Sequence, residues 1–162
     1  MVLDAGADVN LRNKYKKIPL HGLLYFRDHK AEIAQLLLDA GSEVNARDRI
    51  NRTALHEVGF RKVDNSEIIF ALIGRGAEID PRDVYGATPL RGAIIYRNAL
   101  HTEIFVSFGA SVEKAKQSSF LKNLFEERVN DDIIIAAIAL GKSPMGEKWK
   151  NKAQQANDGS LV

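Results

Sequence analysis

Apolar residues along this chain of 162 residues gather in short helical runs, and each run ends at a glycine. The run from Glu32 to Leu38 precedes Gly41, and the run from Glu67 to Ile73 precedes Gly76. The closing glycines Gly6, Gly41, Gly76, Gly109 and Gly141 lie 35, 35, 33 and 32 residues apart. Glycine ends a helix at little steric cost because it accepts the left-handed conformation. The spacing therefore predicts a chain built from repeated helical units.

A second pattern of four residues, called here the tetrad, recurs in the same register, about twelve residues after each of the first three glycines. It reads Ile18-Pro19-Leu20-His21, then Thr53-Ala54-Leu55-His56, then Thr88-Pro89-Leu90-Arg91. Proline in the second place suits the first turn of a helix, and a preceding threonine can cap that turn. Repeats of this length predict a solenoid in which each unit buries its apolar face only against its neighbours, with the central leucine Leu55 fully buried.

At these residues the chain resembles the ankyrin repeat family, over roughly residues 1–113. The resemblance implies an all-α solenoid whose units each contain a hairpin-like finger, an inner helix, a turn and an outer helix. It also implies that the tetrad histidines His21 and His56 hydrogen-bond between neighbouring fingers. We expect an ankyrin-repeat domain over residues 1–141. It divides into a partial first repeat (1–10), three repeats (11–45, 46–80 and 81–113) and a degenerate capping repeat (114–141).

Some positions depart from the family pattern. Lys16 and Asn51 stand where the finger turn usually has a glycine, and only Gly86 keeps it. Arg91 replaces the histidine in the third tetrad, and about two extra residues lie around 27–29 and 62–65. These changes leave the shapes of the fingers open.

The two ends of the chain are predicted separately. Residues 1–5 read as the end of an outer helix with no inner helix before it. This favours a fragment of a longer chain over an array whose first edge is covered by something else, and the initiating methionine is equally consistent with an artificial start. Toward the other end, Phe120, Leu121, Leu124 and Phe125 form an amphipathic stripe, and residues 133–140 are apolar at every position, which predicts a heavily buried helix. Residues 142–162 read as a polar, partly disordered tail.

Composition sets broad limits. The chain has no cysteine and a formal net charge of +2, and its longest apolar run, residues 133–140, is too short to span a membrane. We therefore expect no membrane partner and an intracellular location, cytoplasmic or nuclear, with the inside of a host cell left open. No nucleophile motif or metal-ligand spacing is present, since His29 and His101 have no spaced companion, so no catalytic residue, cofactor or metal is expected.

Charge is concentrated in the fingers. Basic residues dominate the first finger, remain in excess in the second, and are balanced by acids in the third. Such a graded ridge could attract an acidic protein segment, although lysine and arginine are also common in solvated loops. Nucleic acid is an unlikely partner because no aromatic stacking platform accompanies the charge.

The family resemblance places the binding surface on the fingers and inner helices. Tyr15, Ile50 and Tyr85 share one finger position and Tyr25, Phe60 and Tyr96 lie late in the inner helices; both rows could bind a partner or pack internally. The predicted partner-binding residues are Arg12, Lys14, Tyr15, Lys16, Arg47, Arg49, Ile50, Arg82, Tyr85, Tyr25, Phe60 and Tyr96.

The function expected from this pattern is non-enzymatic binding of another protein through the concave face. Two alternatives remain open: a viral or bacterial ankyrin protein that sequesters a host signalling factor, and a regulatory ankyrin segment of a larger enzyme or channel. The identity of the partner and the oligomeric state do not follow from the sequence.

Overall fold

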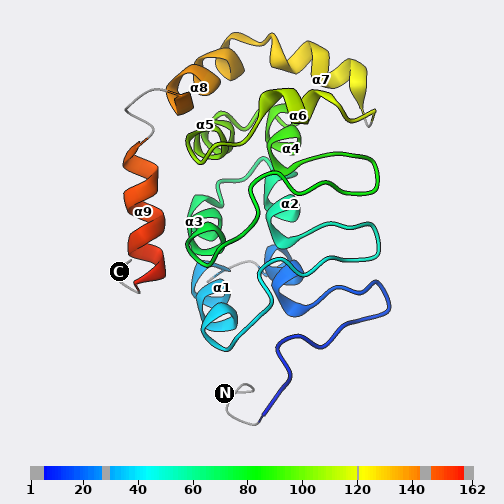
Figure 1. The fold of residues 1–162 in the computed structure, drawn as a ribbon, viewed down its shortest axis with the longest axis vertical. Helices are drawn as coiled ribbons and strands as arrows, with labels where there is room; N and C mark the ends of the chain where they lie inside the picture. Colours follow the sequence, from blue (N-terminus) through cyan, green and yellow to red (C-terminus); the bar gives the residue numbers. More distant parts are fainter. Residues whose placement is uncertain (1–5, 27–29, 120, 143–146, 159–162) are drawn as a thin grey trace.

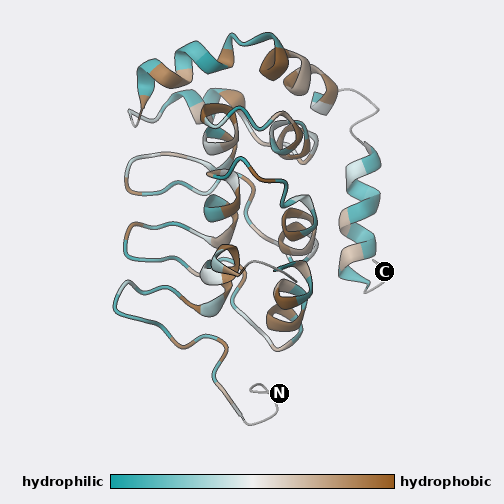
Figure 2. Cartoon of the chain, turned by 180° about the vertical axis from the view of Figure 1, so that it is seen from behind, coloured by the Kyte–Doolittle hydropathy of each residue, from teal (hydrophilic) through white to brown (hydrophobic). Residues whose placement is uncertain are grey.

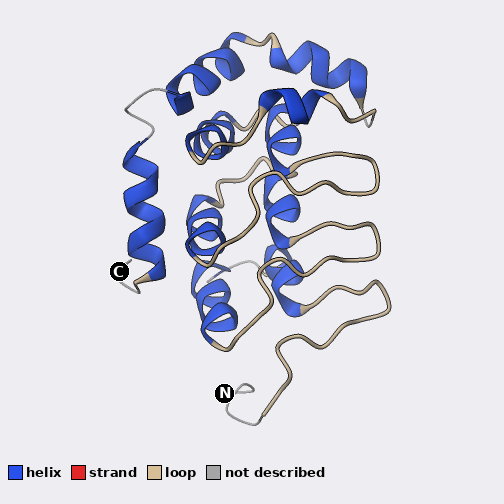
Figure 3. Ribbon diagram, in the orientation of Figure 1, coloured by secondary structure: helices blue, strands red, loops and turns tan. Residues whose placement is uncertain are grey.

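A computed structural model describes residues 6–26, 30–119, 121–142 and 147–158. Helices are the only regular secondary structure in its described part, where long loops connect them and no β-strand occurs (Figure 3). The first helices are η2 (Pro19–Tyr25, a 3₁₀ helix), α1 (Lys30–Asp39), α2 (Ala54–Gly59), α3 (Ser66–Gly74), α4 (Pro89–Ile95) and α5 (Ala99–Ser107). The chain continues through α6 (Val112–Lys116), α7 (Lys122–Val129), α8 (Asp132–Lys142) and α9 (Glu147–Asn157).

Three successive units have the same shape. Each consists of a long loop, called here a finger, and two helices that follow it (Figure 1). The inner row is η2, α2 and α4, and the outer row is α1, α3 and α5; each middle helix packs between its neighbours in the row. The fingers project side by side from the inner row. The units therefore stack in the order of the sequence.

Glycines close the three outer helices as predicted, but the prediction that Gly141 closes a fourth is wrong, because it lies inside α8. Gly41, Gly76 and Gly109 follow α1, α3 and α5 with φ angles of 86°, 83° and 89°. In each case the amide of the next residue bonds back to the helix, as in Ser42 N to Leu37 O at 3.0 Å. A residue with a Cβ would be strained in this conformation, which explains why glycine recurs at these positions.

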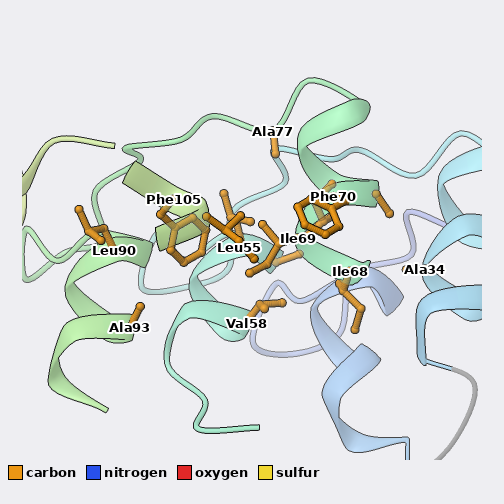
Figure 4. Packing of buried hydrophobic residues seen from close by; sticks show 14 of the residues in the cluster. Ala34, Leu55, Val58, Ile68, Ile69, Phe70, Ala77, Leu90, Ala93 and Phe105 are labelled. Carbon is orange, nitrogen blue, oxygen red and sulfur yellow. The ribbon is translucent and has the colours of Figure 1, made fainter. Parts of the chain in front are cut away.

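One apolar core runs through the stack. Leu55 on α2 is 1% exposed, which confirms its predicted burial, and it lies among Ile69 and Phe70 of α3 and Phe105 of α5 (Figure 4). Leu90, the equivalent residue on α4, is also fully buried. Inner and outer helices of neighbouring units thus share the same core.

The segment after α5 forms a further helical pair. Helix α7 packs on α4, and α8 packs on α5, so the pair lies where a fourth inner and outer helix would stack. Phe125 on α7 is 2% exposed. The prediction of a heavily buried helix over residues 133–140 is wrong, however. Ile133, Ile135 and Leu140 are 53%, 50% and 41% exposed, because α8 ends the stack and only one of its faces has a neighbour.

The prediction of a polar tail also needs correction. Residues 147–157 form helix α9, which turns back and packs along α3 and α5 (Figure 1). Trp149 stacks on Phe70 with ring centroids 5.6 Å apart, and Ala153 and Ala156 are each 4% exposed. A Cβ on Gly74 would lie 2.7 Å from the Ala153 carbonyl oxygen, so the glycine permits the close approach. One tryptophan and two alanines suffice to dock an otherwise polar helix.

Other sequence predictions fall outside the described residues. These are the partial helix at residues 1–5, the extra residues at 27–29 with His29, and Phe120.

Candidate interaction surface

The three finger turns have one geometry despite their different residues. At the start of each turn a side-chain oxygen accepts two backbone N–H groups: Asn13 from Tyr15 and Lys17, Asp48 from Ile50 and Arg52, and Asp83 from Tyr85 and Ala87. The fourth residues, Lys16, Asn51 and Gly86, all have left-handed φ angles, of 59°, 60° and 71°. The departures from glycine in the first two turns therefore do not change the fingers.

The predicted row of Tyr15, Ile50 and Tyr85 occupies equivalent places at the fingertips. The Tyr15 carbonyl accepts from Arg49 N at 2.9 Å, and the Ile50 carbonyl accepts from Val84 N at 3.0 Å. At the third fingertip the Ser118 hydroxyl donates to the Tyr85 carbonyl at 2.8 Å. Backbone bonds thus fix the spacing of the row, while Tyr15 and Tyr85 remain 50% and 49% exposed.

Three of the predicted binding arginines instead connect the fingers. Arg12 reaches the next unit at Glu43 (3.0 Å) and at the Arg47 carbonyl (3.0 Å). Arg47 repeats both contacts one unit later, with Glu78 at 2.7 Å and the Arg82 carbonyl at 3.2 Å. Arg82 donates to Gln117. These arginines form a ladder along the stack, and their guanidinium groups already bond within the protein.

The remaining finger cations fall into two groups. Lys17 pairs with Glu57 at 2.7 Å, and Arg52 pairs with the buried Asp83 at 3.1 Å. By contrast, no acidic side chain among the described residues pairs with Lys14, Lys16 or Arg49, all of which are exposed. Lys14 lies over the Tyr15 ring at 5.1 Å. Among these remaining cations, those without an acidic partner therefore lie on the first two fingertips.

The row late in the inner helices is only partly available. Phe60 meets Tyr96 edge to face at 6.2 Å, and the Arg52 guanidinium lies 4.6 Å from the Phe60 ring centroid. Phe60 therefore fills space between units, as one of the two sequence interpretations held. Tyr25 is 73% exposed and Tyr96 is 38% exposed. These two remain accessible from solvent.

Two exposed apolar residues beside these rows were missed by the sequence analysis. Phe26 follows Tyr25 and is 50% exposed, and Val84 precedes Tyr85 and is 54% exposed. Val84 occupies the place in the third finger that the cations Lys14 and Arg49 hold in the first and second fingers. Comparing that position across the three units would have revealed a change from charged to apolar at the third fingertip.

Beneath the fingers, a side chain at the third helical position links each unit to the next. The amide of Thr53 donates to His56 Nδ1 at 3.1 Å, so Nε2 carries the proton and bonds the Ala87 carbonyl at 3.0 Å. His21 bonds the Arg52 carbonyl at 3.0 Å in the same way. The histidine links implied by the sequence are confirmed.

In the third unit Arg91 takes over this role. Thr88 caps its helix as predicted, because its hydroxyl accepts from Arg91 N at 3.3 Å. The buried guanidinium donates to the Ala115 carbonyl at 2.6 Å and lies 4.4 Å from the centroid of the Phe125 ring. Burial lowers the pKa of Arg91, while Asp83 and Glu126 oppose that shift. An arginine thus anchors the C-terminal helices.

Burial also keeps two histidines neutral. Desolvation lowers the pKa of His56 to about 4, against the opposing effect of its bond to the Ala87 carbonyl. The pKa of His101 is likewise lowered to about 4 by burial, with Asp64 opposing. His101 Nε2 accepts from Asn65 N at 3.1 Å and so ties α5 to the start of α3. Both rings are structural connections between helices.

A metal-holding cluster and a membrane-spanning helix are both absent from the described residues. They contain no cluster of three or more His, Cys, Asp or Glu side chains that could hold a metal ion. Within the same residues, no helix is both long enough and apolar enough to cross a membrane. No protein-family model matches this sequence, and no curated protein matches it at a significant level.

Proposed function

We propose that the chain is an ankyrin-repeat protein that binds another protein, without enzymatic activity, through its fingers and inner helices. The repeated links support this assignment: the arginine ladder, the Asx-type finger turns and the histidine bridges each recur at an interval of 35 residues. Because these links hold the backbone of the fingers, the exposed side chains on them are presented in a fixed arrangement. A preorganised surface loses little conformational entropy on binding.

The observation that carries the proposal is the graded chemistry of the fingertips. Lys14, Lys16 and Arg49 are exposed cations on the first two fingertips. Val84 and Tyr85 are about half exposed on the third. A partner segment that carries acids at one end and large apolar side chains at the other would match both halves of this surface, which are the basic first two fingertips and the apolar third fingertip.

The two halves would contribute differently to binding. Exposed charges steer encounter and raise the association rate, and salt screens them. An aromatic side chain buried by a partner contributes mainly to slow dissociation. The ladder arginines belong to neither half, because changing one of them would disturb the stack itself.

The experiment uses the full chain as bait and then measures kinetics with the captured protein. Reversing both Lys14 and Arg49 to Glu should slow association and reduce its dependence on salt. Tyr85→Ala should speed dissociation, at a cost of about 1–2 kcal/mol. Gln35→Ala is the matched control, since Gln35 lies on outer helix α1 and bonds only Asp39 of the same helix, at 3.0 Å. A partner disturbed only by outer-helix changes would refute the finger assignment.

A further inference from the structure

Helix α8 is apolar around most of its circumference, yet the described chain covers only one of its faces. Ile134, Ala137 and Gly141 are buried toward α5. A Cβ on Gly141 would lie 2.6 Å from the Glu103 carbonyl oxygen, so the two helices are in close contact there. The opposite face holds Ile133, Ile135, Ala136, Ala139 and Leu140, all exposed. Figure 2 shows α8 as a mainly hydrophobic helix at the end of the stack.

No later element in the described part of the chain stacks on this face. The helix that follows, α9, lies along α3 and α5 instead of stacking on α8 (Figure 1). Its hydrophilic character in Figure 2 contrasts with that of α8. An exposed apolar face next to a polar surface of this kind marks an interaction site.

The exposed face of α8 is complementary to itself. At 100° per residue, Ala136 and Ala139 lie near its centre, Ile133 and Leu140 lie along one side, and Ile135 lies along the other. If a second copy approaches antiparallel about a two-fold axis near Ala136, Ile133 meets Leu140 of the other copy and Ile135 meets Ala139. The small central residues permit close approach of the helices.

Charge supports the same register. Asp132 stands at the first residue of α8 and Lys142 at its last, and the antiparallel arrangement brings each opposite the other charge of the second copy. The helix dipoles are also opposed in this arrangement, which is favourable. A contact of this type is isologous and closes at two copies.

We propose that the chain forms a two-fold homodimer through the exposed face of α8. The contact is separate from the fingertips, so it does not depend on the function proposed above. One helix face is smaller than a standard interface. The dimer is therefore weak, with a dissociation constant roughly in the micromolar range. Each dimer would present two sets of fingers.

Sedimentation velocity from about 1 µM to about 1 mM tests the proposal, because the wild type should pass from monomer to dimer over that range. Ala136→Glu should abolish the dimer while leaving the helical circular dichroism signal intact, since Ala136 is exposed. Lys142→Glu should weaken the dimer about threefold to tenfold. Adding Asp132→Lys to it should restore association by reversing both members of each pair.

Cross-linking tests the two-fold axis directly. The natural chain has no cysteine. Ala136→Cys should therefore yield a disulfide-linked dimer under mild oxidation, because the two copies of the residue lie near the axis. Asn151→Cys, on the exposed side of α9, is the matched control and should remain mostly monomeric.

Three results would overturn the proposal. The first is a monomer at every concentration, which would mean that any occupant of the face is another molecule. The second is association that survives Ala136→Glu. The third is association that Leu36→Glu abolishes, because Leu36 is exposed on α1 at the other end of the stack and its loss would indicate head-to-tail stacking.

Discussion

The joints between the regular units and the joint to the C-terminal helices lie at the same position of the inner helix but use different side chains. In the first two units a histidine bonds a carbonyl of the next finger, 31 residues further along the chain. In the last unit the following finger is replaced by the short helix α6, and Arg91 bonds a carbonyl only 24 residues on. What the stack needs at this position is a buried donor that reaches the next unit. The identity of the residue depends on the shape of that unit.

The two solutions differ in their cost. A neutral imidazole can be buried with its two nitrogens satisfied, whereas a buried guanidinium carries charge and needs compensation. Arg91 obtains it from the Ala115 carbonyl, the Phe125 ring and the carboxylates of Asp83 and Glu126. At this inner-helix position the C-terminal helices are therefore joined through a charged side chain, where the first two units are joined to the next finger through histidine.

The largest effect expected in the regular region comes from its core. Leu55→Ala should lower the free energy of unfolding by about 2–5 kcal/mol, because Leu55 is fully buried between inner and outer helices. Urea denaturation followed by circular dichroism measures this loss. A loss under roughly 0.5 kcal/mol would show that Leu55 is not part of the shared core.

Acidification should lower the stability that the histidine joint supplies, but not the stability that the arginine joint supplies. The pKa of His56 is about 4 in the folded protein, against its ordinary value of 6.5. The unfolded chain therefore binds the extra proton first as pH falls. The stabilisation is complete above pH 6.5 and is lost between that value and about 4. At pH 4.5 the loss due to His56 alone is roughly 2–3 kcal/mol.

The measurement is the unfolding free energy of the wild type and of His56→Gln across that pH range. The glutamine variant should be less stable at pH 7 but should lose less stability on acidification. His101 titrates in both proteins and so cancels from the comparison. Parallel pH profiles for the two proteins would contradict the assignment.

Arg91 provides the matching test in the C-terminal joint. Arg91→Met keeps much of the side-chain volume but removes the donor to the Ala115 carbonyl. A buried carbonyl without its donor costs about 1–3 kcal/mol, and the loss should be nearly independent of pH between 5 and 8, since arginine keeps its charge there. Unfolding measured at both ends of that range checks both statements. A loss that changes with pH would implicate another group.

Much of the regular region was predictable because its constraints are local. Three signals act within a few residues of their own position. They are the glycine after each outer helix, the proline or threonine at the start of each inner helix, and the leucine in each tetrad. Leu55 and Thr88 were placed correctly on that basis. The row of Tyr15, Ile50 and Tyr85 was found in the same way, from equivalent positions in successive units.

The remaining features depend on contacts that no local pattern contains. The exposed arginines Arg12 and Arg47 looked like binding residues, but their acidic partners Glu43 and Glu78 lie 31 residues away. The burial of residues 133–140 was overestimated because hydrophobicity does not indicate how many neighbours a helix has. Helix α9 was missed because its average polarity hides three residues, Trp149, Ala153 and Ala156, that share one face.

The docking of α9 should be weaker than the joints within the stack. Trp149 stacks on Phe70, and its Nε1 donates to Glu103 at 2.8 Å. Trp149→Ala should therefore release α9, at a cost of about 1–2 kcal/mol, with little effect on unfolding of the stack itself. Amide hydrogen exchange should show faster exchange in residues 150–157 and unchanged exchange in α2 and α4. Asn151→Ala is the control, because Asn151 lies on the same helix and is exposed.

The smallest effects concern backbone strain, and they test whether both regions unfold together. Lys16, in the first finger, and Leu121, just before α7, both have left-handed φ angles, of 59° and 51°. A side chain with a Cβ is disfavoured there, although glycine loses more entropy on folding, so Lys16→Gly and Leu121→Gly should each stabilise by about 0.5–1 kcal/mol. Gly86→Ala, at φ 71°, should destabilise by a similar amount and serves as the reverse control.

If the regular units and the C-terminal helices form one cooperative unit, both glycine variants raise the same thermal transition. If Leu121→Gly leaves the main transition where it is, the helices after α5 unfold separately, and neither Arg91 nor the packing of α7 and α8 couples them to the stack.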